Sequence, residues 1–195
     1  TNDPRLYQRA VEIALQGRYG ISALQAARAW KQAMPTSREA NRYVLQILIG
    51  LNRLGEALEP LKREVATADP KERAATISVL PLYFARAIDK KLAASIVEQT
   101  LADYLTTPTV GVVSWSVIGR MRFDAADHAG AVEAARKAQS LDGKSELPAL
   151  LALSFMGSKV TSAESIVTKY LDGKPRPEVR MEYVRVLLNA RRYAE

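Results

Sequence analysis

Apolar residues recur at intervals of three and four along almost the whole chain, and strict alternation nowhere persists for the length of a strand. This spacing places the apolar side chains on one face of each helix, so the pattern predicts an all-α chain. Because the connections are short, successive helices are expected to pack antiparallel. The predicted helices are 4–16, 21–33, 37–51, 54–68, 70–88, 90–106, 109–123, 128–140, 145–156, 160–171 and 176–189.

Helix-start and helix-stop residues divide the chain at these boundaries. Asp3 and Asp69 each precede a proline, the order expected of an N-cap followed by the first helical residue. Two further starts have the spacing of a capping box, Thr36 with Glu39 and Thr161 with Glu164. Gly143 and Gly173 each follow an aspartate at a predicted helix end, where a left-handed residue is favoured. Pro81 is expected to kink helix 70–88 or to end it early.

Small residues occupy apolar-face positions where a core helix ordinarily carries leucine or phenylalanine. Ala131, Ala135 and Ala138 are an example, and they predict two helices that approach closely. Similar alanine-led helices recur along the chain, at Ala26, Ala57, Ala94, Ala131 and Ala163. Their spacings are 31, 37, 37 and 32 residues. A period of about 34 residues predicts a repeat of helix pairs.

The repeat resembles the tetratricopeptide repeat (TPR) family. In its best-matching copy, Trp115, Ile118 and Gly119 stand where the family motif has a bulky residue, a leucine and a glycine. Ala131 and Ala138 stand where the second helix of the motif has its two alanines. The chain departs from the motif elsewhere in this copy, with Arg122, Ala135 and Gly143 in place of tyrosine, an aromatic residue and proline. The first copy needs about three extra residues in its turn to fit.

This resemblance implies a single domain over residues 1–195, a right-handed α-solenoid of about five and a half TPR-like antiparallel helix pairs. The expected repeats are 4–35, 37–69, 70–107, 109–143, 144–175 and an incomplete sixth at 177–195. The sixth stops at Tyr193-Ala194-Glu195, one residue before its expected alanine. We therefore expect the chain to be a fragment of a longer repeat protein, because an unpaired first helix leaves an apolar face open.

Catalytic chemistry finds little support among the residue types present. Cysteine is absent and His128 is the only histidine, so thiolate chemistry is excluded and a metal or general-base site lacks a second strong ligand. His128 is expected to be an exposed turn residue. No phosphate-binding glycine loop or nucleophile elbow occurs, and no apolar run is long enough to span a membrane. We expect a protein that is not an enzyme and that needs no cofactor or metal.

The TPR resemblance implies that the first helices of the pairs line a concave face that binds a peptide or partner protein. The residues carried over to that face are Arg42, Gln46, Tyr83, Arg86, Ser116, Arg120, Phe123, Arg185 and Asn189. Arginines interleaved with aromatic residues suit a ligand with carboxylates and apolar side chains. The fifth repeat contributes Ala152, Phe155 and Met156 instead, an apolar patch expected to anchor a ligand or to be covered by a neighbouring chain. The alternative is that the arginines are solvated and the aromatic residues fill the core.

The segments DPRLYQRAVEIAL and SREANRYVLQILIGLNR also resemble the repeat proteins that proteobacteria export as outer-membrane lipoproteins. That resemblance implies an adaptor in the bacterial envelope, periplasmic and held by an N-terminal lipid anchor, with a periplasmic protease among its possible partners. A cytoplasmic location is the alternative. The net charge of +7 leaves open a nucleic-acid-binding or regulatory arm. An accessory arm of an enzyme with its catalytic domain elsewhere is a third hypothesis.

Overall fold

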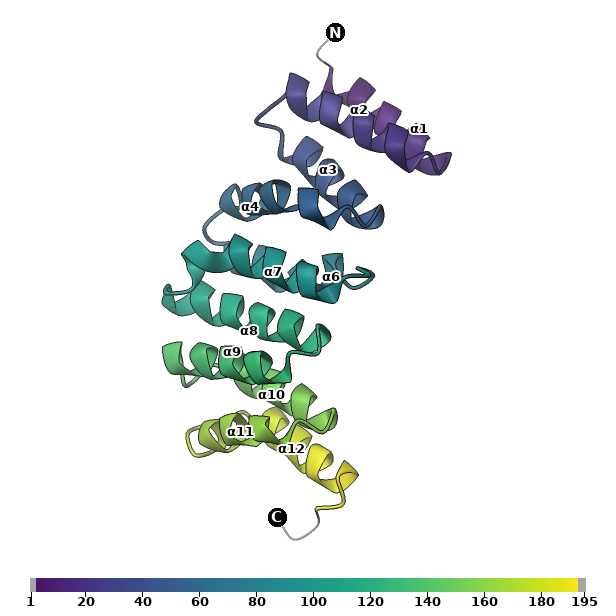
Figure 1. Ribbon diagram of the computed structural model, residues 1–195. Helices are drawn as coiled ribbons and strands as arrows, with labels where there is room; N and C mark the ends of the chain where they lie inside the picture. The colour runs from purple at the N-terminus through teal and green to yellow at the C-terminus, as the bar shows by residue number, and fades with distance from the viewer. Residues whose placement is uncertain (1–2, 193–195) are drawn as a thin grey trace. The chain divides into compact units, whose positions relative to one another are not determined.

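The computed structural model describes residues 3–192, and the chain divides into two compact units, Thr1–Thr100 and Leu101–Glu195 (Figure 1). All regular structure in the described residues is helical, which confirms the predicted all-α class. The last residues of the expected sixth repeat, Tyr193 to Glu195, lie outside the described residues. The extent of each predicted repeat, and their assembly into one domain, stay predictions.

The first unit begins with three successive antiparallel helices. Helices α1 and α2 pack together, α2 packs on α3, and α3 packs on α4. Their shared core includes Val11, Leu24, Trp30, Val44 and Leu48, all buried. The helices of this unit are α1 (Pro4–Gln16), α2 (Gly20–Ala33), α3 (Arg38–Gly50), α4 (Leu58–Ala66), α5 (Arg73–Ser78), α6 (Leu80–Tyr83) and α7 (Lys90–Leu101), the last residue of α7 belonging to the second unit. A 3₁₀ turn, η1 (Leu54–Glu56), precedes α4.

In the second unit, successive helices pack against one another in pairs. Helix α8 packs against α9, α10 packs against both, α11 covers α10, and α12 packs on α10. Phe155, Ile166 and Val167 are among the fully buried residues at its centre. The elements of this unit are η2 (Ala102–Tyr104), α8 (Pro108–Asp124), α9 (His128–Leu141), α10 (Leu147–Gly157), η3 (Thr161–Ala163), α11 (Glu164–Leu171) and α12 (Pro177–Asn189). The packing confirms the prediction of antiparallel helix pairs.

Small residues do allow α8 and α9 to approach closely. Ala131, Ala135 and Ala138 are completely buried. A Cβ added to Gly119 would lie 3.2 Å from the carbonyl oxygen of Ala131 and 3.5 Å from the Cβ of Ala134. There is consequently room for hydrogen, but little for a side chain, where the two helices meet. This close contact explains the alanine pattern in the sequence.

Five first helices of pairs end in the same left-handed turn. Its residues have φ between 55° and 70° and are Arg18, Asn52, Ala126, Lys159 and Arg191. In each case the next amide donates to the carbonyl five residues earlier, at 2.8–3.0 Å, which is the Schellman arrangement. None of the glycines described has a positive φ, so the left-handed role predicted for Gly143 and Gly173 is wrong. Non-glycine residues therefore form this turn, and these hydrogen bonds close it.

This turn also corrects the alignment of the first pair. Ala57 and Ala131 each lie five residues after their left-handed residue, and Ala23 lies five residues after Arg18. Ala23 is completely buried, whereas Ala26, the predicted equivalent, is only half-buried. The first pair therefore needs no extra residues in its turn.

Most predicted helix starts hold within a few residues, but their caps differ. Asp3 caps α1 as expected, through a bond from the Arg5 amide. Ser37, not Thr36, caps α3, and its hydroxyl accepts from the Ala40 amide. Asp69 accepts from the Lys71 amide in a turn, and α5 begins later, at Arg73.

The predicted capping box at Thr161 and the predicted break at Pro81 both lie where one helical segment gives way to another. Thr161 opens the 3₁₀ turn η3, and α11 has no side-chain cap, so the capping box predicted there is wrong. The helix expected at 70–88 is broken at Val79 into α5 and α6, with Pro81 in the first turn of α6. The predicted effect of Pro81 is thereby confirmed.

Candidate functional site

In the first unit, three of the residues predicted to bind a partner line one groove. Gln46, Tyr83 and Arg86 surround a cavity of about 400 Å³. We call this cavity the α3–α6 groove, and the rest of its lining consists of Ile49, Gly50, Asn52, Leu82, Ala85 and Ile88. Residues distant in sequence thus meet because α6 and the segment after it lie beside the C-terminal half of α3.

The break at Pro81 and one hydrogen bond set the shape of this groove. Because α6 is short, the chain leaves the helical path after Tyr83 and reaches the start of α7 through a turn. The Ile88 amide donates to the side-chain oxygen of Asn52 at 3.2 Å, which ties that turn to the end of α3. Asn52 is also the left-handed residue that ends the first helix of its pair. One residue therefore contacts both sides of the groove, the end of α3 and the turn after α6.

The groove combines one charge with exposed apolar surface. Arg86 is the only charged residue in its lining, and within residues 3–192 its side chain makes no hydrogen bond or ion pair. The side chains of Gln46 and Tyr83 likewise make no hydrogen bond within that range. Leu82 and Ile88 are 73% and 82% exposed. A ligand that offers a carboxylate and apolar groups would satisfy all of these positions.

Arg42, the fourth predicted residue of this unit, does not line the groove and forms an ion pair with Glu64. Its Nη2 and Nε lie 2.9 and 3.3 Å from one carboxylate oxygen of Glu64. The Glu64 side chain is only 1% exposed, and Arg38 stands 3.9 Å from the same oxygen. Hydrogen bonding to this carboxylate raises the pKa of Arg42 above its usual value. The guanidinium is therefore already occupied by a carboxylate of its own chain.

The predicted residues of the second unit do not converge on a cavity in the same way. Arg120 pairs with Asp124 at 3.0 Å, and Arg185 pairs with Glu182 at 2.7 Å. The Ser116 hydroxyl donates to the Val112 carbonyl at 2.8 Å, and Asn189 is exposed near the end of α12. These interactions hold the polar side chains against their own helices.

Phe123 is a packing residue in this structure. Its ring stacks on Phe155, with centroids 4.6 Å apart, and on the exposed His128 at 5.1 Å. Ala152, Phe155 and Met156 are all buried in the core of the same unit. The apolar patch predicted from these three residues is therefore covered by its own chain, and the expectation of an open patch is wrong.

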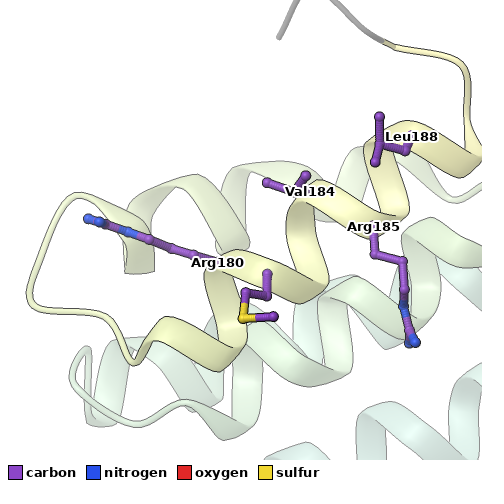
Figure 2. A pocket seen from close by; sticks show the side chains of 5 residues that line it. Arg180, Val184, Arg185 and Leu188 are labelled. Atoms are coloured by element: carbon purple, nitrogen blue, oxygen red, sulfur yellow. The ribbon is translucent and has the colours of Figure 1, made fainter.

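Arg185 borders an open apolar surface on α12, the helix on which the repeat pattern predicts an open apolar face because the sixth repeat lacks its second helix. Met181, Val184 and Leu188 lie along α12 and are 72%, 53% and 50% exposed. Arg180 and Arg185 extend in different directions from the helix beside them (Figure 2). The spacing of three and four residues places these apolar side chains on one face of the helix. In the first unit, Leu82 and Ile88 could have been noticed because Pro81 interrupts the helical face that would bury them.

The described residues contain no group of three or more histidines or carboxylates placed to hold a metal ion. None of their helices is both long enough and apolar enough to cross a membrane. The candidate site is the α3–α6 groove, because it brings three of the predicted residues together around one cavity.

Comparisons with known proteins give structural similarity only. No family model matches the chain, and no curated protein does so. A crystal structure of MamA is 16% identical, with a TM-score of 0.45, and covers 90% of this chain and 96% of its own. A MamA RS-1 ArsTM double mutant is 15% identical, with a TM-score of 0.44, over 87% of this chain and 93% of its own. A further MamA structure is 13% identical, with a TM-score of 0.46, over 98% and 96%.

Proposed function

We propose that this protein is a non-catalytic interaction scaffold whose α3–α6 groove binds a peptide segment of a partner protein. The observation that carries this proposal is the convergence of Gln46, Tyr83 and Arg86 on one cavity, each with a polar side chain that makes no hydrogen bond within the described residues. Unpaired polar groups beside exposed Leu82 and Ile88 favour a ligand with both a carboxylate and apolar side chains.

Arg86 is the residue that tests the groove most directly. Arg42, Arg120 and Arg185 are paired within the chain, so changing them would disturb the fold or a local ion pair. Arg86→Glu reverses the only charge in the groove without breaking an intramolecular interaction in the described part of the chain. Lys62→Glu, at an exposed position on α4 outside the groove lining, makes the same change in net charge and is the matched control.

The experiment is affinity capture from a bacterial envelope extract with the parent chain and these two variants, followed by mass spectrometry. A protein retained by the parent and by Lys62→Glu, but lost with Arg86→Glu, supports the proposal. Binding of a synthetic peptide from that protein then confirms direct contact. If Arg86→Glu retains the same proteins as the parent chain, the groove is not the binding site.

We further propose that the scaffold works in the bacterial envelope, as a periplasmic adaptor held by a lipid anchor, with a periplasmic protease among its partners. The resemblance of the segments DPRLYQRAVEIAL and SREANRYVLQILIGLNR to exported repeat lipoproteins supports this. Fractionation of cells that express the natural protein tests it. Recovery in the cytoplasm would contradict the location and leave the groove unaffected.

A further inference from the structure

A second pocket adjoins the α3–α6 groove on the other side of α3. It has a volume of about 280 Å³, and its lining includes Leu15, Tyr43 and Leu51. Gln46 and Gly50 line both this pocket and the groove, so the two are separated only by the last turns of α3. Leu15 is 42% exposed, which leaves apolar surface accessible at this second position.

Gly50, the last residue of α3, lines both pockets and carries no side chain between them. Its φ is not positive, so the backbone there does not require glycine. A Cβ built on Gly50 would meet no atom within 4 Å, whereas one on Gly20 would lie 2.7 Å from Leu51. Neither conformation nor internal packing therefore excludes a side chain at position 50. Gly50 is exposed, so a molecule bound in either pocket can reach its backbone.

We propose that the peptide ligand is an extended segment that crosses α3 at Gly50, with one apolar side chain in each pocket and an acidic side chain paired with Arg86. This proposal rests on the proposed function. The missing Cβ lets a backbone approach closely, and the Gln46 amide can both donate to and accept from a peptide group. In an extended segment, alternate side chains point the same way, which lets successive anchors enter neighbouring pockets while the backbone stays near α3.

Charge complementarity selects the acidic side chain. Neither pocket has an aspartate or glutamate in its lining, and Arg86 is the only charge in both together. A guanidinium with no carboxylate of its own chain binds a carboxylate through two parallel hydrogen bonds. A basic ligand would meet only repulsion at this position.

The test uses a phage-displayed library of random dodecapeptides selected on the full chain, and fluorescence anisotropy of the best synthetic peptides. Gly50→Trp fills the open space between the pockets, and Gly50→Ala is its matched control. We expect Gly50→Ala to bind within about twofold of the parent chain, and Gly50→Trp and Arg86→Glu to lose at least tenfold. Circular dichroism melts of Gly50→Trp should coincide with the parent, because the substituted position is open.

The outcomes separate this inference from the proposed function. If Arg86→Glu abolishes binding and Gly50→Trp does not, the groove binds peptides but the crossing at Gly50 is wrong. If neither variant affects binding, or no peptide is selected, both proposals fail. Proline placed in turn at each position between the two apolar anchors of the ligand decides its conformation. An extended peptide tolerates proline wherever its amide is not bonded to Gln46, whereas a helix tolerates proline at none of these interior positions. Loss of binding with proline at every position would overturn the extended mode.

Discussion

Replacing Arg42 by methionine should lower the free energy of unfolding by about 3 kcal/mol, although half of the Arg42 side chain faces solvent. The reason lies with its partner. The Glu64 side chain is 1% exposed, and its second oxygen is buried without a hydrogen-bond partner in the described residues. Without Arg42 the buried carboxylate would keep only Arg38, at 3.9 Å. Methionine preserves much of the apolar stem, so the loss is mainly electrostatic.

Replacing Glu64 instead of Arg42 should lower the free energy of unfolding much less. The Arg42 side chain is 49% exposed, so its guanidinium can turn to water when Glu64 is replaced by glutamine. We expect Glu64→Gln to cost about 1 kcal/mol, and the double variant to cost little more than Glu64→Gln alone. The resulting coupling between the two positions would be about 3 kcal/mol.

Urea unfolding followed by circular dichroism near neutral pH measures all four proteins of this cycle. With a slope of roughly 2 kcal/mol per molar urea, Arg42→Met should shift the midpoint down by about 1.5 M. The reasoning is refuted if Arg42→Met costs no more than Glu64→Gln, because the asymmetry follows directly from the burial of the carboxylate. Additive effects of the two changes would refute it equally.

Three other perturbations test the turns, the close helix contact and an ion pair of the second unit. Ala126→Gly should stabilise the chain by about 0.5–1 kcal/mol in urea unfolding, because Ala126 has a φ of 62°; an equal loss would show that the turn is not strained. Gly119→Leu should cost at least about 2 kcal/mol and lower the thermal midpoint, since a Cβ there already meets Leu151 at 3.0 Å. Hydrogen bonds from Arg192 and Tyr183 hold the pKa of Glu164 below its usual value. That stabilisation is complete above the unfolded-state pKa of about 4.3 and is lost as pH falls through the lower folded-state value. Glu164→Gln should therefore cost about 1 kcal/mol at neutral pH, and the difference should vanish in acid; a constant difference would contradict the assignment.

The sequence predicts what depends on local pattern. Helical periodicity gives the all-α class, proline gives the break before α6, and small residues give the close pairing of α8 with α9. The turns were harder to predict because non-glycine residues such as Arg18 and Lys159 adopt the left-handed conformation there. A rule that looks for glycine therefore selects the wrong positions. The first pair is displaced by three residues for a different reason, because the alanine pattern favours Ala26 where the buried residue is Ala23.

The candidate site was predictable only in part. The repeat register identified Gln46, Tyr83 and Arg86 as residues of one surface, and the structure places all three on one groove. The register could not tell which arginines are available for a ligand. The Arg42 guanidinium is unavailable because it is paired with Glu64, which lies 22 positions away in sequence. That ion pair forms only when α3 and α4 pack together.

The left-handed turns also have a consequence for folding. Each places a residue such as Ala126 or Lys159 in a conformation that an isolated chain rarely adopts, at a cost of about 1–2 kcal/mol. A single helix pair must therefore be poorly stable alone, and contact with its neighbours must supply the difference. Stacked repeats with weak units and strong interfaces fold with high cooperativity. Amide hydrogen exchange should accordingly find that the helices of α8 to α11 open together rather than one pair at a time.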